Sequence, residues 1–334
     1  MTIERIAVIG GGAWGTALAN AAALAGREVV LWMRQAEAAR AMRDSRENTR
    51  YLPGVRLHAR VTPTAEPARL GTADAALLVV PAQTVRAVTT EVAGALAAHA
   101  PLVVCAKGIE RGTGLFLSDA VAQVRPGAPV AVLSGPSFAD DVARGLPTAV
   151  TLACADEDLA EAIAAALSGP SLRLYRNSDV RGVEIGGAAK NVLAIACGAV
   201  VGRGLGESAK AALTARGFAE LMRFARAYGG EPETLMGLSG LGDLVLTCGS
   251  AHSRNFAFGE RLGRGVPVAE ASAGKLAEGA FTASVLVELA RTKEVDMPIA
   301  AAVEAVIETR CTVDEAIDAL MSRPLKAEHE GENG

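Results

Sequence analysis

The chain has 334 residues, of which 50% are hydrophobic, 21% are charged and 4% are aromatic. Its length favours two domains, and its net charge of −4 argues against a nucleic-acid-binding protein. The five cysteines are dispersed and odd in number, and the four histidines lack metal-ligand spacing, so we expect reduced thiols, a cytoplasmic protein and no bound metal.

A glycine motif follows the first predicted strand. Residues 5–9 form a short apolar run, and Gly10, Gly12 and Gly15 then fit the pattern G-x-G-x-x-G at the start of a helix-forming stretch. In this pattern one glycine makes a tight turn, the next lets backbone approach a pyrophosphate, and the third lets helix and strand pack. The helix N-terminus attracts the phosphates. The pattern predicts a dinucleotide-binding β-α-β unit; the alternative is a glycine-rich turn without a ligand.

The same region carries no charge from residue 6 to residue 26, a length that could span a bilayer. A signal peptide would need a basic start and a more apolar centre. Here the acidic Glu4 precedes the stretch, which contains three consecutive glycines and Asn20. We therefore expect a buried strand-turn-helix unit and no membrane span.

Strand and helix patterns alternate through the first half of the chain. Strands are expected at 28–32, 57–61, 75–80, 102–106, 130–133, 148–153 and 172–175, and helices at 37–45, 84–98 and 157–167. Several of these strands are continuous apolar runs, which is typical of strands buried on both faces. The alternation predicts a mostly parallel, doubly wound sheet over residues 1–180.

Strand patterns stop after residue 180. Helices are expected at 183–202, 208–228, 255–263, 282–292, 297–308 and 313–321. The first of these is nearly all apolar over 192–201, so we expect it to be buried. We predict an all-helical domain over 181–322, followed by a polar tail at 323–334 that is expected to fray.

The end of the second predicted strand bears on the nicotinamide cofactor. Folds that prefer NAD place an Asp or Glu near this point to bind the ribose 2′-hydroxyl. Residues 32–35 contain no carboxylate, and Glu37 already lies in the next helix. Arg34 is suited to pair with a 2′-phosphate or to stack on adenine; the alternative is a solvated arginine. We expect NADPH to be used at least as well as NADH.

Polar residues follow two of the buried strands. Ligands of doubly wound sheets bind beyond the carboxyl ends of the strands. Lys107 follows the strand at 102–106, and the segment 134–138 follows the next strand. We expect Lys107 to enter the cleft, and the backbone N–H groups of 134–138 with the Ser137 hydroxyl to hold polar substrate atoms. The alternatives are a surface lysine and a plain Gly-Pro turn.

Lys190 lies in a helix that is apolar on most sides. Burying an unpaired ammonium is costly, so this lysine needs a partner or a ligand. Desolvation would lower its pKa toward the range useful for proton transfer. Asp243, between glycines and an apolar run, is a candidate partner. The alternatives are a lysine whose head group reaches water and an aspartate that caps a helix.

The segment Ser253-Arg254-Asn255 precedes a predicted helix. A hydroxyl, a guanidinium and an amide at a helix start suit a phosphate monoester. The alternative is ordinary helix capping by Ser253.

Over residues 3–322 the chain resembles the bacterial NAD(P)-dependent sn-glycerol-3-phosphate dehydrogenases. The motifs that carry the resemblance are Gly10-x-Gly12-Ala13-Trp14-Gly15-Thr16-Ala17-Leu18-Ala19, Asn48-x-x-Tyr51-Leu52-Pro53, Lys107-Gly108-Ile109-Glu110, Ser134-Gly135-Pro136-Ser137-Phe138-Ala139, Ala189-Lys190-Asn191, Gly240-Leu241-Gly242-Asp243-Leu244 and Ser253-Arg254-Asn255. The resemblance implies a Rossmann-like N-terminal domain and an all-α C-terminal domain like that of 6-phosphogluconate dehydrogenase.

The resemblance also implies an activity. It is the reversible reduction of dihydroxyacetone phosphate to sn-glycerol 3-phosphate, a precursor of the phospholipid backbone, with NADPH or NADH as the cofactor. Because family members are commonly homodimers, we expect a homodimer.

Individual residues match family positions. Lys190 matches the catalytic general acid/base. The substrate-site matches are Lys107, Gly135, Ser137, Lys190, Asp243, Ser253, Arg254 and Asn255. The cofactor-site matches, with the three glycines, are Ala13, Trp14, Arg34, Lys107, Ala139, Arg254, Leu276 and Glu278. The chain departs from the family at Ala13, where Ser is frequent, in the segment 275–279, and at Phe256, where a basic residue is usual.

Two other functions stay open at this point. One is a reductase of the same two-domain superfamily that acts on a hydroxy acid, against which the phosphate-binding features of 253–255 argue. The other is a catalytically silent NAD(P)-binding sensor, which has no need of Lys107, Lys190 and Asp243 together.

Overall fold

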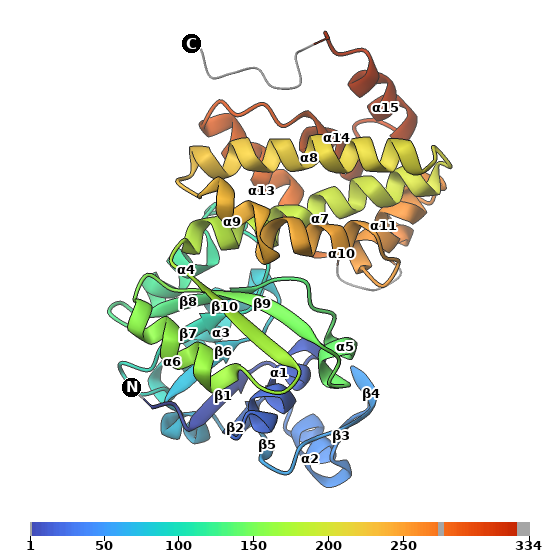
Figure 1. Ribbon diagram of the computed structural model, residues 1–334. Helices are drawn as coiled ribbons and strands as arrows, with labels where there is room; N and C mark the ends of the chain where they lie inside the picture. The colour runs from blue at the N-terminus through green and yellow to red at the C-terminus, as the bar shows by residue number, and fades with distance from the viewer. Residues whose placement is uncertain (1, 273–276, 326–334) are drawn as a thin grey trace.

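The computed structural model describes residues 2–272 and 277–325, and it has an α/β half and an all-helical half stacked end to end (Figure 1). The α/β half contains an eight-stranded sheet in the order β10-β9-β8-β7-β6-β1-β2-β5. Neighbouring strands are parallel except for the antiparallel pair β8 and β9. The strands are β1 Arg5–Ile9, β2 Glu28–Trp32, β5 Val61–Thr64, β6 Ala75–Leu78, β7 Leu102–Val104, β8 Val130–Ser134, β9 Thr148–Ala153 and β10 Leu172–Asn177. The mostly parallel, doubly wound sheet is confirmed.

Both faces of the central strands are covered, which explains why β6 and β7 are apolar on both sides. Successive side chains of β1 point to opposite faces: Ile6 and Val8 pack on one side, and Ala7 and Ile9 on the other. The first side is covered by α1 Ala13–Leu24, α2 Ala36–Ser45, α5 Ala139–Ala143 and α6 Glu157–Leu167. The second is covered by the 3-10 helix η1 Pro67–Thr72, α3 Val85–Val92 and α4 Leu117–Val124.

Between α2 and η1 the chain differs from the sequence-based prediction. The strand expected at 57–61 is wrong, because residues 58–61 form a turn in which the Val61 N–H donates to the His58 carbonyl at 2.9 Å. A two-stranded antiparallel sheet precedes this turn, and β5 follows it. That small sheet, of β3 Glu47–Asn48 and β4 Leu52–Arg56, was not predicted.

Other boundaries also differ. The helix expected at 84–98 ends as α3 at Val92 and continues only as the 3-10 helix η3 Ala93–Ala95, which contains Gly94. A further 3-10 turn, η2 Ala82–Thr84, precedes α3.

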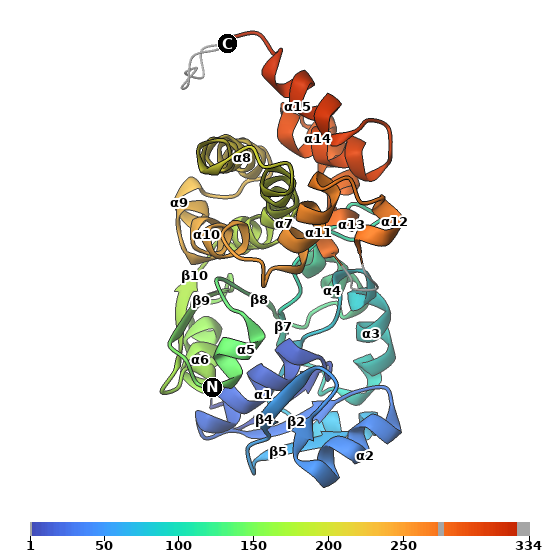
Figure 2. The same cartoon turned by 90° about the vertical axis from the view of Figure 1, so that its right-hand side faces the viewer.

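The helical half is built around one long central helix, α7 Val180–Gly202 (Figure 2). This helix is long and apolar enough to cross a membrane, but 83% of its most apolar window is buried inside the fold, as in the core helix of a globular domain. The other helices are α8 Glu207–Ala227, α9 Pro232–Met236, the π-helical turn η4 Leu238–Gly242, α10 Asp243–Cys248, α11 Arg254–Gly263, α12 Val268–Ala271, α13 Glu278–Thr292, α14 Pro298–Ile307 and α15 Val313–Met321.

Glycines let α11 lie directly on α7. A Cβ at Gly259 would stand 1.9 Å from the Ile195 carbonyl oxygen, and a Cβ at Gly198 would stand 2.1 Å from the Phe256 carbonyl oxygen. Gly202 and Gly263 make similar backbone approaches. Because the two backbones touch, the N-terminus of α11 is held in a fixed position against the middle of α7.

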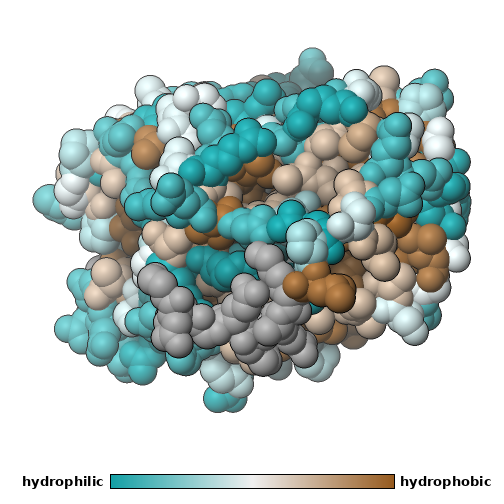
Figure 3. Space-filling model, turned by 90° about the horizontal axis from the view of Figure 1, so that it is seen from above, coloured by the Kyte–Doolittle hydropathy of each residue, from teal (hydrophilic) through white to brown (hydrophobic). Residues whose placement is uncertain are grey.

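The predicted tail at 323–334 lies largely outside the described residues, which end at 325. Seen from the end that carries α8, α14 and α15, the surface is mostly hydrophilic with scattered apolar side chains (Figure 3).

Candidate active site

The glycine motif forms the loop between β1 and α1. Gly10 has a φ of +125°, and a Cβ there would lie 2.1 Å from the Val79 carbonyl oxygen. A Cβ at Gly15 would lie 1.8 Å from the Gly10 carbonyl oxygen, so close packing within the chain accounts for both glycines. At Gly12 a Cβ would meet nothing within 4 Å. Internal packing therefore does not explain the glycine at position 12. The absence of a side chain there leaves the space before the α1 N-terminus open for a pyrophosphate.

The residues that follow Gly12 begin α1. Ala13 and Trp14 are its first two residues, and both are partly buried against the core on that side of the sheet. Ala139 begins the short helix α5, which packs on α1. Three of the predicted cofactor positions therefore lie around the glycine loop.

Asn48 fixes this loop from the small sheet. Its Nδ2 donates to the Gly11 carbonyl at 3.0 Å and to the Thr16 hydroxyl at 2.8 Å. The Thr16 hydroxyl in turn donates to the Gly12 carbonyl at 2.9 Å. Asn48 is 4% exposed, so the loop is held from inside the protein. Sequence reasoning placed Asn48 in a family motif without a role.

Arg34 follows β2 at the same edge of the sheet. The Trp32 carbonyl accepts the Gly10 N–H at 2.9 Å, which places the end of β2 beside the glycine loop. The Arg34 Nε lies 2.9 Å from a carboxylate oxygen of Glu91 on α3. Arg34 is therefore ion-paired within the protein, a partner that the sequence analysis did not foresee.

Two lysines share one buried carboxylate at the boundary between the halves. The Lys107 Nζ lies 2.5 Å from Asp243 Oδ2, and the Lys190 Nζ lies 2.5 Å from Asp243 Oδ1. Lys107 also donates to the Gly135 carbonyl at 2.9 Å, and Lys190 to the Thr247 hydroxyl at 2.7 Å. These residues come from the ends of β7 and β8 and from α7 and α10, so the cluster joins the sheet to the helical half.

The cluster carries a net positive charge. Side-chain exposure is 18% for Lys107, 7% for Lys190 and 1% for Asp243. Burial lowers the pKa of Lys190 to about 8, with Lys107 acting in the same direction and Asp243 opposing it. Burial alone would raise the pKa of Asp243, but the two ammonium groups bring it below its usual value. At neutral pH the cluster is thus two cations on one anion, an arrangement that attracts a developing oxyanion.

Glu278 reaches across from the first turn of α13. Its Oε1 accepts the Ala82 N–H, just past β6, at 3.1 Å. Burial raises the pKa of Glu278, while the Ala82 N–H and the charges of Arg254, Lys107 and Lys190 oppose that rise. Glu278 therefore belongs to the same electrostatic environment as the two lysines. Leu276, predicted beside it, lies outside the described residues.

The three residues predicted to hold a phosphate meet at the N-terminus of α11. Ser253 is the N-cap, and its hydroxyl accepts the Phe256 N–H at 3.3 Å. Asn255 is buried: its Nδ2 donates to Asn191 Oδ1 at 3.0 Å, and its Oδ1 accepts the Gly279 N–H at 2.9 Å. Arg254 is exposed. The capping expected of Ser253 as the alternative occurs, and Asn255 ties α11 to α7 and α13.

Ser137 and Gly135 lie in the turn after β8. The Ser137 hydroxyl donates to the Gly135 carbonyl at 3.1 Å, the same oxygen that accepts from Lys107. Phe138, in the same turn, contacts the His252 ring with a centroid separation of 6.0 Å. This turn therefore approaches the start of α11 from the opposite side of the domain boundary.

Comparison with known proteins identifies the family. Residues 5–160 match the family model described as "NAD-dependent glycerol-3-phosphate dehydrogenase N-terminus". Residues 179–318 match the model described as "NAD-dependent glycerol-3-phosphate dehydrogenase C-terminus". One relative is the glycerol-3-phosphate dehydrogenase [NAD(P)+] of Methylobacterium radiotolerans. It is 65% identical to this chain, and the match covers 97% of this chain and 98% of the relative. The chain belongs to the NAD-dependent glycerol-3-phosphate dehydrogenase family.

Other members agree. A glycerol-3-phosphate dehydrogenase of Azorhizobium caulinodans is 63% identical over 97% of this chain and 98% of its own length. The crystal structure of glycerol-3-phosphate dehydrogenase from Coxiella burnetii has a TM-score of 0.91 at 37% identity, covering 96% of this chain and 99% of that one. The Rossmann-like domain followed by a helical domain is confirmed as the family fold.

Two further residues contact the candidate site. The sequence analysis did not name Thr247, and it placed Asn191 in a family motif without a role. Thr247 lies one helical turn after Asp243, so the two share a face of α10. Asn191 follows Lys190 directly and bonds Asn255. Helical spacing could have pointed to Thr247, whereas the partner of Asn191 is 64 residues away in the sequence.

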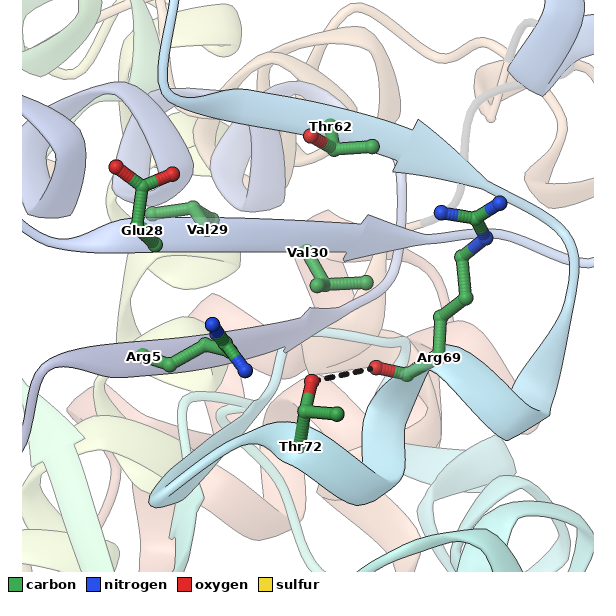
Figure 4. Close-up of a pocket in the computed structure, with 7 residues that line it drawn as sticks. All are labelled: Arg5, Glu28, Val29, Val30, Thr62, Arg69 and Thr72. Atoms are coloured by element: carbon green, nitrogen blue, oxygen red, sulfur yellow. Dashed lines mark hydrogen bonds between the residues drawn. The ribbon is translucent and has the colours of Figure 1, made fainter.

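A depression of about 270 Å³ lies away from this cluster (Figure 4). Its lining includes Arg5 and Glu28, the first residues of β1 and β2, together with Arg69 and Thr72 of η1. It therefore lies near the amino ends of these strands, whereas the glycine loop and the lysines follow carboxyl ends. We assign it no part in the active site.

Proposed function

We propose that this chain catalyses the reversible, NAD(P)H-dependent reduction of dihydroxyacetone phosphate to sn-glycerol 3-phosphate, which feeds glycerophospholipid synthesis. The observation that carries the proposal is the buried pairing of Lys190 and Lys107 with Asp243, beyond the carboxyl ends of β7 and β8. A dinucleotide-binding loop alone would need no such cluster.

Lys190 is the proposed catalytic acid/base. Its lowered pKa lets it hold a proton near neutral pH and release it without a large cost. It donates that proton to the oxygen of the developing alkoxide. Asp243 and Thr247 orient its ammonium group, and Lys107 adds a second positive charge that stabilises the oxyanion.

Ser253, Arg254 and Asn255 form the proposed site for the substrate phosphate. The N–H groups and dipole of α11, a helix of ten residues, favour an anion at its N-terminus. The exposed guanidinium of Arg254 adds the charge that a phosphate needs. Ser137 and Gly135 hold the substrate from the sheet side.

The residues present fit a nicotinamide dinucleotide. The open space at Gly12 and the N-terminus of α1 suit its pyrophosphate, and Ala13 and Trp14 border that space. Arg34, just past the end of β2 beside the glycine loop, is the proposed contact to the adenine ribose, and Ala139, Arg254 and Glu278 complete the proposed set. The reduced cofactor supplies the hydride when it is bound.

Oxidation of the product tests this proposal. Purified protein should reduce NADP+ or NAD+ when sn-glycerol 3-phosphate is added. Glycerol and sn-glycerol 1-phosphate, which lack the phosphate or have the other configuration, should give little or no signal. Equal rates with glycerol would contradict the assigned phosphate site.

We also propose that residues 1–180 and 181–322 act as the cofactor and substrate domains, and that the chain works as a homodimer in the cytoplasm. Membership of the family supports the dimer, because the resemblance to that family implies one. Sedimentation should give about twice the chain mass of 34.1 kDa.

A further inference from the structure

Glu91 is the acidic partner of the arginine proposed for the adenine ribose. It lies in the last turn of α3, and its Oε2 is 2.9 Å from the Nε of Arg34. Two observations place Arg34 beside the glycine loop: the Trp32 carbonyl binds the Gly10 N–H, and a Cβ at Gly11 would stand 2.7 Å from the Met33 side chain. Glu91 therefore brings a negative charge to the edge of the cofactor site from a different crossover of the sheet.

We propose that Glu91 sets the preference between NADPH and NADH by competing with the 2′-phosphate of NADPH for Arg34. This inference rests on the proposed function, because it takes Arg34 as a cofactor residue. A guanidinium binds a phosphate best through two parallel N–H groups. The Nε–H of Arg34 already donates to Glu91. Glu91 therefore occupies one of the N–H groups through which the guanidinium could bind a phosphate.

NADPH and NADH meet this pair differently. A 2′-phosphate must either displace Glu91 from Nε or share the cation with it, and in both cases two anions lie close together. The 2′-hydroxyl of NADH carries no charge and meets no such repulsion. Glu91 therefore weakens the binding of NADPH and leaves that of NADH nearly unchanged.

Exposure limits the size of the effect. The side chains of Arg34 and Glu91 are 49% and 41% exposed, so water and salt screen their charges. We expect removal of the Glu91 charge to tighten NADPH binding by about two- to fivefold, and this gain to shrink as the salt concentration rises.

The test compares wild type with Glu91→Gln, which keeps the size of the side chain and removes its charge. Dissociation constants of NADPH and NADH are measured on the full chain by nicotinamide fluorescence. Glu66→Gln is the matched control, because Glu66 pairs with Arg69 at 3.0 Å through side chains that are also exposed. We expect Glu91→Gln to tighten NADPH alone and Glu66→Gln to change neither constant.

Two results would overturn the inference. An unchanged ratio of the two constants would show that Glu91 does not act on the cofactor. Weaker NADPH binding in Glu91→Gln would show that Glu91 orients Arg34 toward the phosphate instead of competing with it. Turnover of dihydroxyacetone phosphate by wild type is assayed separately, so failure of the proposed reaction would be visible while the binding ratio still decides the role of Glu91.

Discussion

Lys190 is the residue on which the proposed chemistry depends most directly. Replacing it with Ala removes the proton donor but leaves the glycine loop and Arg34 untouched. General acid catalysis typically contributes about 10²- to 10⁴-fold, so we expect Lys190→Ala to lose at least about 100-fold in kcat. Cofactor affinity, measured by fluorescence titration, should stay nearly constant.

A matched control separates the proton donor from a general loss of charge. Lys210→Ala removes a lysine of α8 whose ammonium pairs with the exposed Glu207. Its kcat should remain close to wild type. Near-wild-type turnover in Lys190→Ala would refute the assignment of Lys190 as the acid.

The pH profile of the reaction reports the same group. The pKa of Lys190 is lowered to about 8, so the protonated form that donates in the reduction is lost as the pH rises through that value. We expect kcat/KM for reduction to fall above about pH 8, and kcat/KM for oxidation, which needs the neutral amine, to rise over the same interval.

Asp243→Asn gives this profile a second test. The Asp243 carboxylate raises the pKa of Lys190 against the effect of burial, so its removal should lower that pKa and move the reduction limb to lower pH. If kcat/KM for reduction falls at the same pH in Asp243→Asn as in wild type, or near the ordinary lysine pKa of 10.5, Asp243 does not raise the pKa of Lys190 as described.

At the scale of elements, we expect the contact between α7 and α11 to set the distance between the proposed proton donor and the proposed phosphate site. Gly259→Ala would drive a methyl group into the Ile195 backbone, 1.9 Å from its carbonyl oxygen. We expect a loss of about 1–3 kcal/mol in the free energy of unfolding. The KM for dihydroxyacetone phosphate should also rise, because the start of α11 must shift away from Lys190.

Gly94→Ala is the control for this change. A Cβ at Gly94 would meet nothing within 4 Å. The unfolding free energy of Gly94→Ala and its KM for dihydroxyacetone phosphate should therefore stay near the wild-type values. If Gly259→Ala lowers stability without changing KM, the α7–α11 contact does not position the phosphate site.

The elements that the sequence predicts best are those whose burial leaves a clear pattern. The buried strands read as apolar runs because both faces of the sheet are covered, and β9 and α6 have the predicted bounds. Most of the elements that were missed are short: β3 and β4 contain five residues or fewer each, and α5, α9, α10 and α12 are of similar length. The longest missed element is α4, with eight residues. Their formation depends on tertiary contacts, such as the bond from Asn48 to Gly11, which no local pattern contains.

At the scale of the whole molecule, the cluster of Lys107, Lys190 and Asp243 forms where the two halves meet. The sequence indicated which residues belong to the candidate site. A lysine in an apolar helix needs a partner, and regularly spaced glycines after a strand are typical of a dinucleotide-binding loop. The partners of these residues were harder to predict from the sequence. Lys107 and Asp243 are 136 residues apart, and Arg34 and Glu91 lie in two different crossover connections of the sheet. A further buried tie crosses the boundary, since Glu184 of α7 accepts the Ser118 N–H of α4 at 2.8 Å.

The proposed reaction is tested most directly by the loss of NADPH absorbance on adding dihydroxyacetone phosphate to the purified protein, with NADH run in parallel. We expect rapid oxidation of NADPH, at a rate at least equal to that of NADH, and a much slower reaction with unphosphorylated dihydroxyacetone. NADPH that binds but is not oxidised by dihydroxyacetone phosphate would contradict the proposed function.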